Sequence, residues 1–359
     1  MAKLIDLCSK GSSNIAQKDL AACEGQYPIY GAAGFIKNVD FYHQDKPYIA
    51  IVKDGAGVGR VMKLPANSSV IGTMQYIIPN EGVNVSYLAY ALEHMNLAKY
   101  YLGAAIPHIY FKDYCNEELP AHTTKEQNNI AISLDKVSEL IALRREQLAK
   151  LDQLVKARFV EMFGGISDSK KYPYKAVKEL TDVISGGTPS RETSEYWEGG
   201  TIPWVKTTEL QNNIITEIDE HITETGLNNS SAKLVPAGTV LIAMYGQGKT
   251  RGMTGYLGVE ACTNQACACI LPSDRINQKF LWQFFVLSYD NLRDMAKGGN
   301  QPNLNGNIIK NYPVLYPPME LQEQFSAVVE QTDKSKLAIQ QSLDKLELLK
   351  KALMQEYFG

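Results

Sequence analysis

The chain has 359 residues, a formal net charge of −3 and a hydrophobic content of 45%, which suits a soluble globular protein of about two domains. No apolar run approaches the ~20 residues that cross a bilayer, and residues 1–7 carry charge too soon for a signal peptide. We therefore expect a cytoplasmic protein with no membrane partner. The slight negative charge also disfavours a chain that holds DNA unaided, because Lys and Arg make the phosphate contacts.

The first part of the chain alternates short β-rich runs with Gly and Asn turns. Residues 47–52 and 75–79 predict strands, and a helix is expected over residues 85–101. From residue 126 to residue 163 there is no Gly or Pro, and apolar residues recur at heptad spacing, which predicts one long helix in a coiled coil. Gly164 and Gly165 follow where a helix C-cap belongs.

The second part repeats this order of elements. Residues 239–244 and 269–272 predict strands, residues 278–296 a helix, and residues 321–358 a second long helix. We therefore predict four regions: a globular domain at 1–120, a helical spacer at 121–164, a second globular domain at 165–318 and a second spacer at 319–359. The fold class expected is α+β, with the two helices pairing as an antiparallel coiled coil of pseudo-two-fold symmetry.

An internal repeat underlies this organisation. Residues 148–164 match residues 343–359 at an offset of 195, so that Leu148, Leu151 and Gly164 correspond to Leu343, Leu346 and Gly359. Residues 4–11 resemble residues 180–187 at a smaller offset, which places an insertion in the second half, around residues 197–227. Two copies with so long a period predict a duplicated domain rather than a solenoid.

The cysteines predict no metal site. Cys267 and Cys269 alternate within the run Ala-Cys-Ala-Cys-Ile-Leu at 266–271, which indicates a buried strand where Cys acts as a small hydrophobic residue. No His lies nearby to complete a tetrahedral zinc site with Cys262. We expect reduced thiols, no bound metal and no cofactor.

A Gly-rich stretch raises the question of nucleotide binding. Residues 244–251 read Met-Tyr-Gly-Gln-Gly-Lys-Thr-Arg and follow an apolar strand, as a phosphate-binding loop does, but the motif needs Gly where Ala243 stands. The counterpart at 53–60 keeps the glycines at an offset of 193 and lacks the Lys249 equivalent. A P-loop-like nucleotide-binding enzyme stays open as an alternative, and a turn shared by both domains is favoured. No catalytic motif is found, so no catalytic residue is predicted.

Several phrases carry a family resemblance. They are Ile-Ser-Gly-Gly-Thr-Pro-Ser-Arg at 184–191, Ile-Pro-Trp-Val-Lys at 202–206, Val-Pro-Ala-Gly-Thr-Val-Leu-Ile at 235–242, Gly-Asn-Gln-Pro-Asn-Leu at 299–304 and Pro-Pro-Met-Glu-Leu-Gln-Glu-Gln at 317–324; residues 25–31 and 103–107 play similar parts in the first half. Over essentially its whole length the chain resembles the DNA specificity subunit of a type I restriction–modification system. The first half departs from the pattern, because Gly-Ser-Ser-Asn at 11–14 replaces Gly-Gly-Thr-Pro.

The resemblance implies a non-catalytic subunit of a restriction endonuclease and adenine methyltransferase complex. Its two globular domains would be target-recognition domains that bind the two parts of a split, asymmetric site on double-stranded DNA. Its helices would dock methyltransferase subunits, two of them, and restriction subunits that act as ATP-dependent translocase and nuclease would join through the complex. The remaining alternative is a coiled-coil scaffold that does not contact DNA.

Candidate DNA contacts are polar side chains in turn-rich stretches, because base edges and phosphates are bound by such groups. For each of them, a solvated loop or a hydrogen bond within the fold is the competing interpretation. Residues 300–303 are expected to form a structural turn, and Trp197 and Trp204 to pack in the core. The candidates in the second domain are Thr188, Ser190, Arg191, Lys206, Thr207, Thr208, Gln247, Lys249, Thr250 and Arg251, and those in the first are Gln26, Lys37, Lys53, Arg60, Lys63, His108, Tyr110 and Lys112.

Overall fold

The computed structural model describes residues 1–101, 107–246, 248–296 and 303–359, and these form two compact units. Unit 1 contains Met1–Gln147 and Ala338–Gly359, and unit 2 contains Leu148–Leu337. Two helices of 40 residues, α4 (Thr124–Phe163) and α10 (Met319–Phe358), contribute to both units. The remaining helices and the strands fall within one unit each, and both units mix helix with strand, so the predicted α+β class is confirmed.

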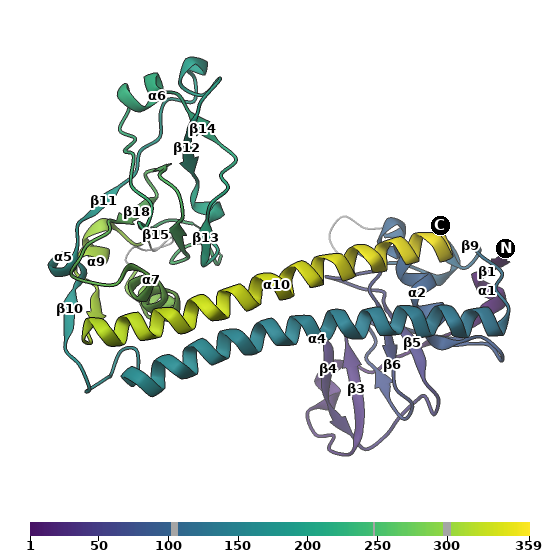
Figure 1. Cartoon of the computed structure of the whole chain (residues 1–359). Helices are drawn as coiled ribbons and strands as arrows, with labels where there is room; N and C mark the ends of the chain where they lie inside the picture. Colours follow the sequence, from purple (N-terminus) through teal and green to yellow (C-terminus); the bar gives the residue numbers. More distant parts are fainter. Residues whose placement is uncertain (102–106, 247, 297–302) are drawn as a thin grey trace. The chain divides into compact units, whose positions relative to one another are not determined.

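Unit 1 is built on a four-stranded antiparallel sheet in the order β2-β8-β5-β6, beside a smaller sheet in the order β4-β3-β7. Its short helices precede and follow the strands (Figure 1). The strands are β1 (Ala2–Lys3), β2 (Cys8–Ser12), β3 (Tyr27–Gly31), β4 (Gly34–Val39), β5 (Tyr48–Val52), β6 (Val61–Leu64), β7 (Ser69–Val70), β8 (Met74–Pro79) and β9 (Glu118–Leu119), and the helices are α1 (Leu4–Leu7), η1 (Gln17–Leu20), α2 (Val85–His94), η2 (Leu97–Tyr100) and α3 (Phe111–Tyr114).

Unit 2 repeats this plan with a five-stranded sheet in the order β11-β18-β15-β16-β13 and a small sheet in the order β14-β12-β17. In both small sheets the central strand has one antiparallel and one parallel neighbour. The strands are β10 (Tyr174–Ala176), β11 (Val183–Ser185), β12 (Ile202–Val205), β13 (Asn213–Ile215), β14 (His221–Ile222), β15 (Val240–Ala243), β16 (Thr254–Leu257), β17 (Cys262–Thr263), β18 (Cys267–Ile270) and β19 (Pro313–Leu315), and the helices are α5 (Val177–Leu180), η3 (Ser194–Tyr196), η4 (Thr207–Glu209), α6 (Glu224–Asn228), α7 (Gln278–Leu287), α8 (Tyr289–Asp294) and α9 (Gly306–Lys310).

The central strands are apolar throughout because both faces of each sheet are covered. In β5, Ile49 and Ile51 belong to a core shared with the helices, whereas Tyr48, Ala50 and Val52 belong to a core shared with the small sheet. Strand β15 divides its side chains between two cores in the same way. Successive side chains of a strand point to opposite faces, so a continuous apolar run is what a strand buried on both sides requires.

The same pair of side chains joins the sheet domain to the long helix in each unit. Asn84 caps α2 by accepting a hydrogen bond from the Tyr87 amide, and the Asn84 amide donates to Gln127 Oε1 of α4 at 3.0 Å. In unit 2, Asn277 caps α7, and its amide donates to Gln322 Oε1 of α10 at 2.9 Å. The repeat seen in the sequence is therefore also a repeat of hydrogen bonds.

Each unit also receives the C-terminal end of the long helix that begins in the other unit. Phe163, at the end of α4, is fully buried in unit 2 with its ring centroid 5.4 Å from that of Phe280. Phe358, at the end of α10, lies in unit 1 with its ring centroid 5.3 Å from that of Tyr87. Figure 1 shows this end of α10 beside α2.

The two long helices run antiparallel where they meet. In unit 1, Arg145 pairs with Glu347 at 2.6 Å, and the last turns of α10 reach the beginning of α4. In unit 2, Asp152 pairs with Lys336 at 2.6 Å. Leu349 of α10 is 45% exposed, so this apolar side chain does not pack fully between the two helices.

Three further details correct the sequence analysis. The helix predicted over 85–101 ends at His94, because Asn96 takes a left-handed conformation with φ +49° before η2 begins. The helix predicted over 278–296 divides into α7 and α8 at the buried Ser288. The alignment of residue 4 with residue 180 is wrong by three positions, because the Leu4 amide donates to Glu117 O as the Val177 amide donates to Tyr312 O.

The insertion in the second half begins after β12 rather than at residue 197, and β14 divides it into two parts. Strand β12 has a counterpart in β3: β3 pairs antiparallel with β4 and parallel with β7, and β12 pairs antiparallel with β14 and parallel with β17. The added chain between β12 and β14 contains η4 and β13, and a further addition after β14 contains α6. Strand β13 extends the main sheet of unit 2 by pairing parallel with β16.

Candidate nucleic-acid interface

One turn occurs in both units at the end of a central strand. In unit 1 it joins β5 to β6, and the Gly59 amide donates to Val52 O at 2.8 Å; in unit 2 it joins β15 to β16, and the Gly252 amide donates to Ala243 O at 2.9 Å. Both glycines have positive φ, +84° and +87°, a conformation that favours Gly. The shared turn predicted from the glycines is therefore present, and Gly59 and Gly252 are equivalent.

This geometry argues against a phosphate-binding loop around Lys249. In a P-loop the glycines lead into a helix whose N-terminus holds the phosphates. Here the chain goes from β15 into an antiparallel partner, β16, with Ile242 opposite Thr254. The stretch is a hairpin turn, so its glycines are explained by turn geometry and the nucleotide-binding alternative loses its structural basis.

In unit 1 the structure brings four of the predicted residues together beside this turn. Asp54 pairs with Lys53 at 3.4 Å and contacts the Nδ1 atom of His108. The His108 ring lies 4.1 Å from the Tyr110 ring, and the Lys112 ammonium lies 5.2 Å from the centre of the same ring. Asp54 was missed by the sequence analysis, although its place directly after the Lys was a possible signal.

The corresponding surface of unit 2 has different side chains at equivalent backbone positions. The Ile109 amide donates to Lys53 O at 3.0 Å in unit 1, and the Leu304 amide donates to Met244 O at 3.0 Å in unit 2. The Lys-Asp pair of the first turn is thus replaced by Met244 and the exposed Tyr245. Lys249 is exposed, Thr250 and Arg251 are partly buried, and Gln247 lies outside the described residues.

Two predicted contacts of unit 2 are engaged by an acidic side chain of the inserted segment. Glu220 pairs with Arg191 at 2.7 Å and with Lys206 at 2.8 Å. The hydrogen bond from Lys206, and then the contact with Arg191, hold the pKa of Glu220 below its usual value. The Arg191 guanidinium also stacks 3.7 Å from the centre of the Trp197 ring, which makes Arg191 part of a packed cluster.

The two tryptophans pack as expected. Trp204 is buried, and its indole N–H donates to Gly187 O at 3.0 Å. Trp197 meets it edge to face, with 5.0 Å between ring centroids. Trp197 stays partly exposed and has the Arg191 guanidinium over its ring, so both rings pack within unit 2.

Several other candidates donate hydrogen bonds inside their own unit. Lys63 pairs with Asp135 of α4 at 3.0 Å, Lys37 donates to Leu20 O at 3.1 Å and Arg60 donates to Ala32 O at 2.8 Å. The remaining candidates lie in loops and short turns: Thr188 bonded to Gln265, Ser190 before η3, Thr207 and Thr208 in η4, and the exposed Gln26 before β3. The structure contains no nucleic acid, so their role as DNA contacts stays a prediction, as does the structural turn expected at residues 300–303, most of which lies outside the described residues.

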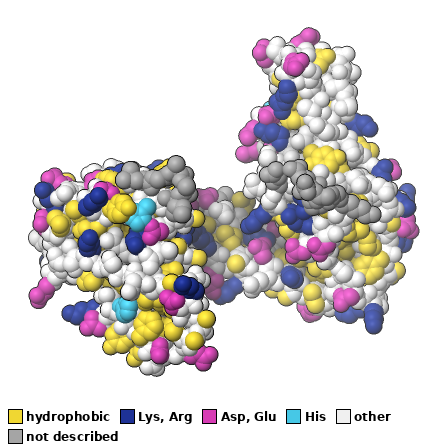
Figure 2. Space-filling model, turned by 180° about the vertical axis from the view of Figure 1, so that it is seen from behind, with side chains coloured by type: hydrophobic (Ala, Val, Ile, Leu, Met, Phe, Trp, Pro, Cys, Tyr) yellow, Lys and Arg dark blue, Asp and Glu magenta, His cyan; other side chains and the backbone are white. Residues whose placement is uncertain are grey.

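The surface charge is mixed. Lys and Arg side chains lie interspersed with Asp and Glu side chains on both units (Figure 2). Within the described parts of the chain, no group of three or more His, Cys, Asp or Glu side chains is arranged to hold a metal ion. Burial raises the pKa of the Cys262 and Cys269 thiols to about 11, and all six cysteines are unbonded to one another.

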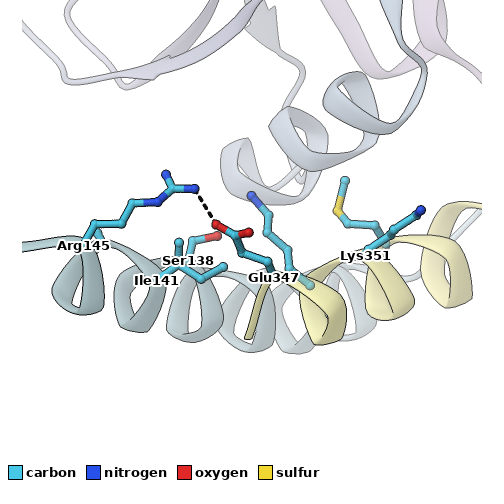
Figure 3. Close-up of a pocket in the computed structure, with 8 residues that line it drawn as sticks. Ser138, Ile141, Arg145, Glu347 and Lys351 are labelled. Atoms are coloured by element: carbon cyan, nitrogen blue, oxygen red, sulfur yellow. Dashed lines mark hydrogen bonds and ion pairs between the residues drawn. The ribbon is translucent and has the colours of Figure 1, made fainter. Parts of the chain in front are cut away.

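A groove lies along the helix pair of unit 1. It has a volume of about 510 Å³, and its lining combines apolar groups with the charged ends of Lys and Arg. Figure 3 shows the Arg145–Glu347 pair at one end, with Ser138 and Ile141 beside it and Lys351 further along α10. None of the helices in the described ranges is both long and apolar enough to cross a membrane.

Two α+β modules of similar plan, each with a turn at the end of its central strand that carries its own set of polar side chains, define a duplicated two-domain protein. Residues 1–153 and 169–349 match the family described as type I restriction modification DNA specificity domain. The chain therefore belongs to this family.

The chain is also similar to three curated specificity subunits over part of its length. It is 30% identical over 172 residues to the type I restriction enzyme MjaIX specificity subunit of Methanocaldococcus jannaschii, covering 46% of this chain and 38% of that one. It is 24% identical over 163 residues to the EcoR124I/EcoR124II subunit of Escherichia coli (45% and 40%) and 28% identical over 207 residues to the HindI subunit of Haemophilus influenzae (53% and 44%). The matched segments thus span less than half of these relatives.

Solved structures share the fold over the whole chain. The crystal structure of the type I restriction–modification S subunit from M. genitalium superposes with a TM-score of 0.67 at 16% identity, covering 100% of this chain and 95% of that one. A structure described as the basis of complex assembly and conformational transition of the type I R-M system gives 0.55 at 15% identity, covering 99% and 96%. The duplicated architecture is therefore the one found in S subunits.

Proposed function

We propose that this chain is the DNA sequence-specificity subunit of a type I restriction–modification complex. It binds a bipartite, asymmetric site on double-stranded DNA, with one half-site for each globular domain. The observation that carries the proposal is the pair of turns after β5 and β15, which close with equivalent backbone hydrogen bonds, differ in length by two residues and present different polar side chains. A symmetric homodimer would present the same polar groups on both of its domains, whereas the two domains of this chain present different polar groups.

The chemistry of the two sets suits base reading. Base edges in the major groove are distinguished by hydrogen bonds from groups such as amides, hydroxyls and Lys or Arg, and phosphates are bound by cations. Around the first turn these groups are Lys53, His108, Tyr110 and Lys112. Around the second they include the exposed Lys249 and Tyr245. The two half-sites should therefore differ in sequence.

The long helices are proposed to dock the partner chains. Helix α4 exposes Leu140 and Leu143, and α10 exposes Leu348, which is 69% exposed, within unit 1. Large apolar side chains on an exposed helix indicate a protein partner, and the groove of Figure 3 lies on the same pair of helices. The partner proposed is the methyltransferase subunit, with two copies per chain, one for each module, and with the restriction subunits joining through the complex in the cytoplasm. The chain itself is proposed to be non-catalytic.

Domain exchange tests the proposal. Residues 1–120 are replaced by the corresponding domain of a relative, and the chain is expressed with its methyltransferase in cells whose methylated motifs are then sequenced. The expected result is a motif that changes in one half only and keeps the other half. The reciprocal exchange of residues 165–318 is the matched control and should change the opposite half. A coiled-coil scaffold that does not contact DNA would leave the motif unaltered in both exchanges.

A further inference from the structure

A short helix clamps the turn that carries Lys249. Arg293 of α8 donates from Nη1 to Arg251 O at 2.6 Å and from Nη2 to Gly248 O at 2.9 Å. Tyr289, one helical turn earlier, donates from its hydroxyl to Lys249 O at 2.7 Å. The guanidinium also donates to the Tyr289 hydroxyl at 3.0 Å. Three carbonyl groups of one turn are thus held by two side chains.

This arrangement fixes which way the turn faces. Because the carbonyls of Gly248, Lys249 and Arg251 are turned toward α8, the turn cannot rotate without breaking several hydrogen bonds. A planar guanidinium bridges two acceptors in a fixed geometry. The backbone at Gly248 has φ +60°, and the Lys249 side chain is exposed. The clamp therefore pre-organises the turn, which lowers the ordering cost of binding a partner on its outer side.

Among the described residues of unit 1, no side chain donates to the carbonyl groups of the equivalent turn. Both turns close with a backbone hydrogen bond near their end, from the Arg60 amide to Gly57 O at 3.0 Å in unit 1 and from the Met253 amide to Thr250 O at 3.0 Å in unit 2. Gly59 faces the backbone of Ala98, whereas its equivalent Gly252 faces the side chains of Arg293 and Tyr289. Beside the first turn there is a cavity of about 400 Å³. In the part of the chain that the structure describes, the clamp is therefore present in unit 2 and has no counterpart in unit 1.

We propose that Arg293, assisted by Tyr289, is a positioning residue that sets the sequence discrimination of the second domain. It acts through the turn at residues 248–252 and not by touching a base. The inference rests on the proposed function, and it adds a residue outside the predicted contacts whose loss relaxes one half-site only. The first half-site then serves as an internal reference within the same molecule and the same experiment.

The test uses the chain co-expressed with its methyltransferase, with methylated motifs sequenced in cells and binding of the purified complex measured on cognate and single-mismatch duplexes. Arg293→Met removes both donors at similar length. Arg293→Lys keeps the charge but cannot bridge two carbonyls, and Tyr289→Phe removes one donor only. Arg275→Met is the matched control, because Arg275 also donates to a main-chain carbonyl of unit 2, Glu179 O at 3.1 Å, away from the turn.

The expected result is a loss of about tenfold in discrimination against mismatches in the half-site assigned to the second domain, roughly the effect of one lost base contact. Discrimination in the other half-site stays within twofold. Arg293→Lys behaves like Arg293→Met, and Tyr289→Phe shows a smaller loss of discrimination in the half-site of the second domain. The control Arg275→Met retains the wild-type motif. Rescue by Arg293→Lys, with a smaller salt dependence in Arg293→Met, would instead assign Arg293 to a phosphate and overturn the inference.

The other outcomes are also decisive. If Arg293→Met abolishes methylation through loss of folding, Tyr289→Phe decides, because one missing hydroxyl leaves the fold intact and should still relax one half-site. Unchanged or evenly relaxed discrimination in Tyr289→Phe and Arg293→Lys overturns the clamp. A wild-type complex with no bipartite motif, or a domain exchange without effect, would overturn the proposed function itself and is seen before any clamp variant is made.

Discussion

The ends of the long helices offer a direct test of how each unit is built. Phe163→Ala removes a fully buried ring whose centroid lies 5.0 Å from that of Phe159, 5.4 Å from that of Phe280 and 5.7 Å from that of Phe325. Phe358→Ala removes a ring that is 7% exposed and meets Tyr87. Truncating a core Phe costs about 3–5 kcal/mol, and packed aromatic pairs add to that.

The two substitutions should differ in size and in place. We expect Phe163→Ala to destabilise unit 2 by about 4–5 kcal/mol, because its ring meets four other aromatic rings. Phe358→Ala should destabilise unit 1 by about 3 kcal/mol, at the low end, because the last helical turn can relax around the gap. The second loss is unusual, since residue 358 follows the whole of unit 2 in the sequence but supports the first 147 residues.

Amide hydrogen exchange read strand by strand is the assay. For Phe358→Ala, exchange in β5 and β8 should accelerate by about a hundredfold where it proceeds through opening of unit 1, since each 1.4 kcal/mol is tenfold. Exchange in β15 and β18 should stay unchanged, and Phe163→Ala should give the opposite pattern. Leu348→Ala, at a 69% exposed position of α10, is the control. Faster exchange in β15 after Phe358→Ala would refute the crossed packing of the helix ends.

Three further substitutions test the joints and the charges. Gln322→Ala leaves the Asn277 amide and Pro317 O without their partner. Thermal unfolding should therefore show that the free energy of unfolding falls by about 2–4 kcal/mol, the order of magnitude for two buried groups without a hydrogen bond. The exposed Gln324→Ala is the control and should change the free energy of unfolding very little. The lowered pKa of Glu220 contributes to the stability of the fold. This contribution is fully present above the usual Glu pKa of 4.5 and is lost as the pH falls through the lowered pKa. Glu220→Gln should abolish that part of the pH dependence of unfolding, and an unchanged profile would contradict the assignment. Lys249→Ala should reduce the slope of log binding constant against log salt by about 1, whereas Lys63→Ala, whose ammonium is held by Asp135, should leave the slope as it is.

Much of this fold could be predicted because its signals are local. A stretch of nearly 40 residues without Gly or Pro predicts a helix, and a short apolar run between glycines predicts a strand buried on both faces. The crossed packing of the helix ends is not local. Heptad spacing predicts that one face of α4 is buried. It does not predict that Phe163 packs against Phe280 rather than against a residue of its own half of the sequence.

The backbone of the candidate site could be predicted from the sequence, but most of its side-chain contacts could not. Glycines with positive φ, such as Gly59 and Gly252, leave a pattern in the sequence because few other residues fit there. Ion pairs leave no such pattern when the two partners are far apart in the sequence. Arg191 and Lys206 have the chemistry of DNA contacts, yet Glu220 holds both. The role of Arg293 leaves no signal in the sequence, because an arginine in a helix shows its role only together with the turn that it holds.

These ion pairs bear on how the chain would hold DNA. A cation already paired with a carboxylate must exchange one anion for another when it meets a phosphate, so it gains less and releases fewer counterions than a solvated one. Lys53, Lys63 and Lys206 are all paired in this way, and the chain carries a net charge of −3. Under the proposed function, the turns of this chain contribute selectivity between sequences, and most of the affinity has to come from the partner chains that its helices dock.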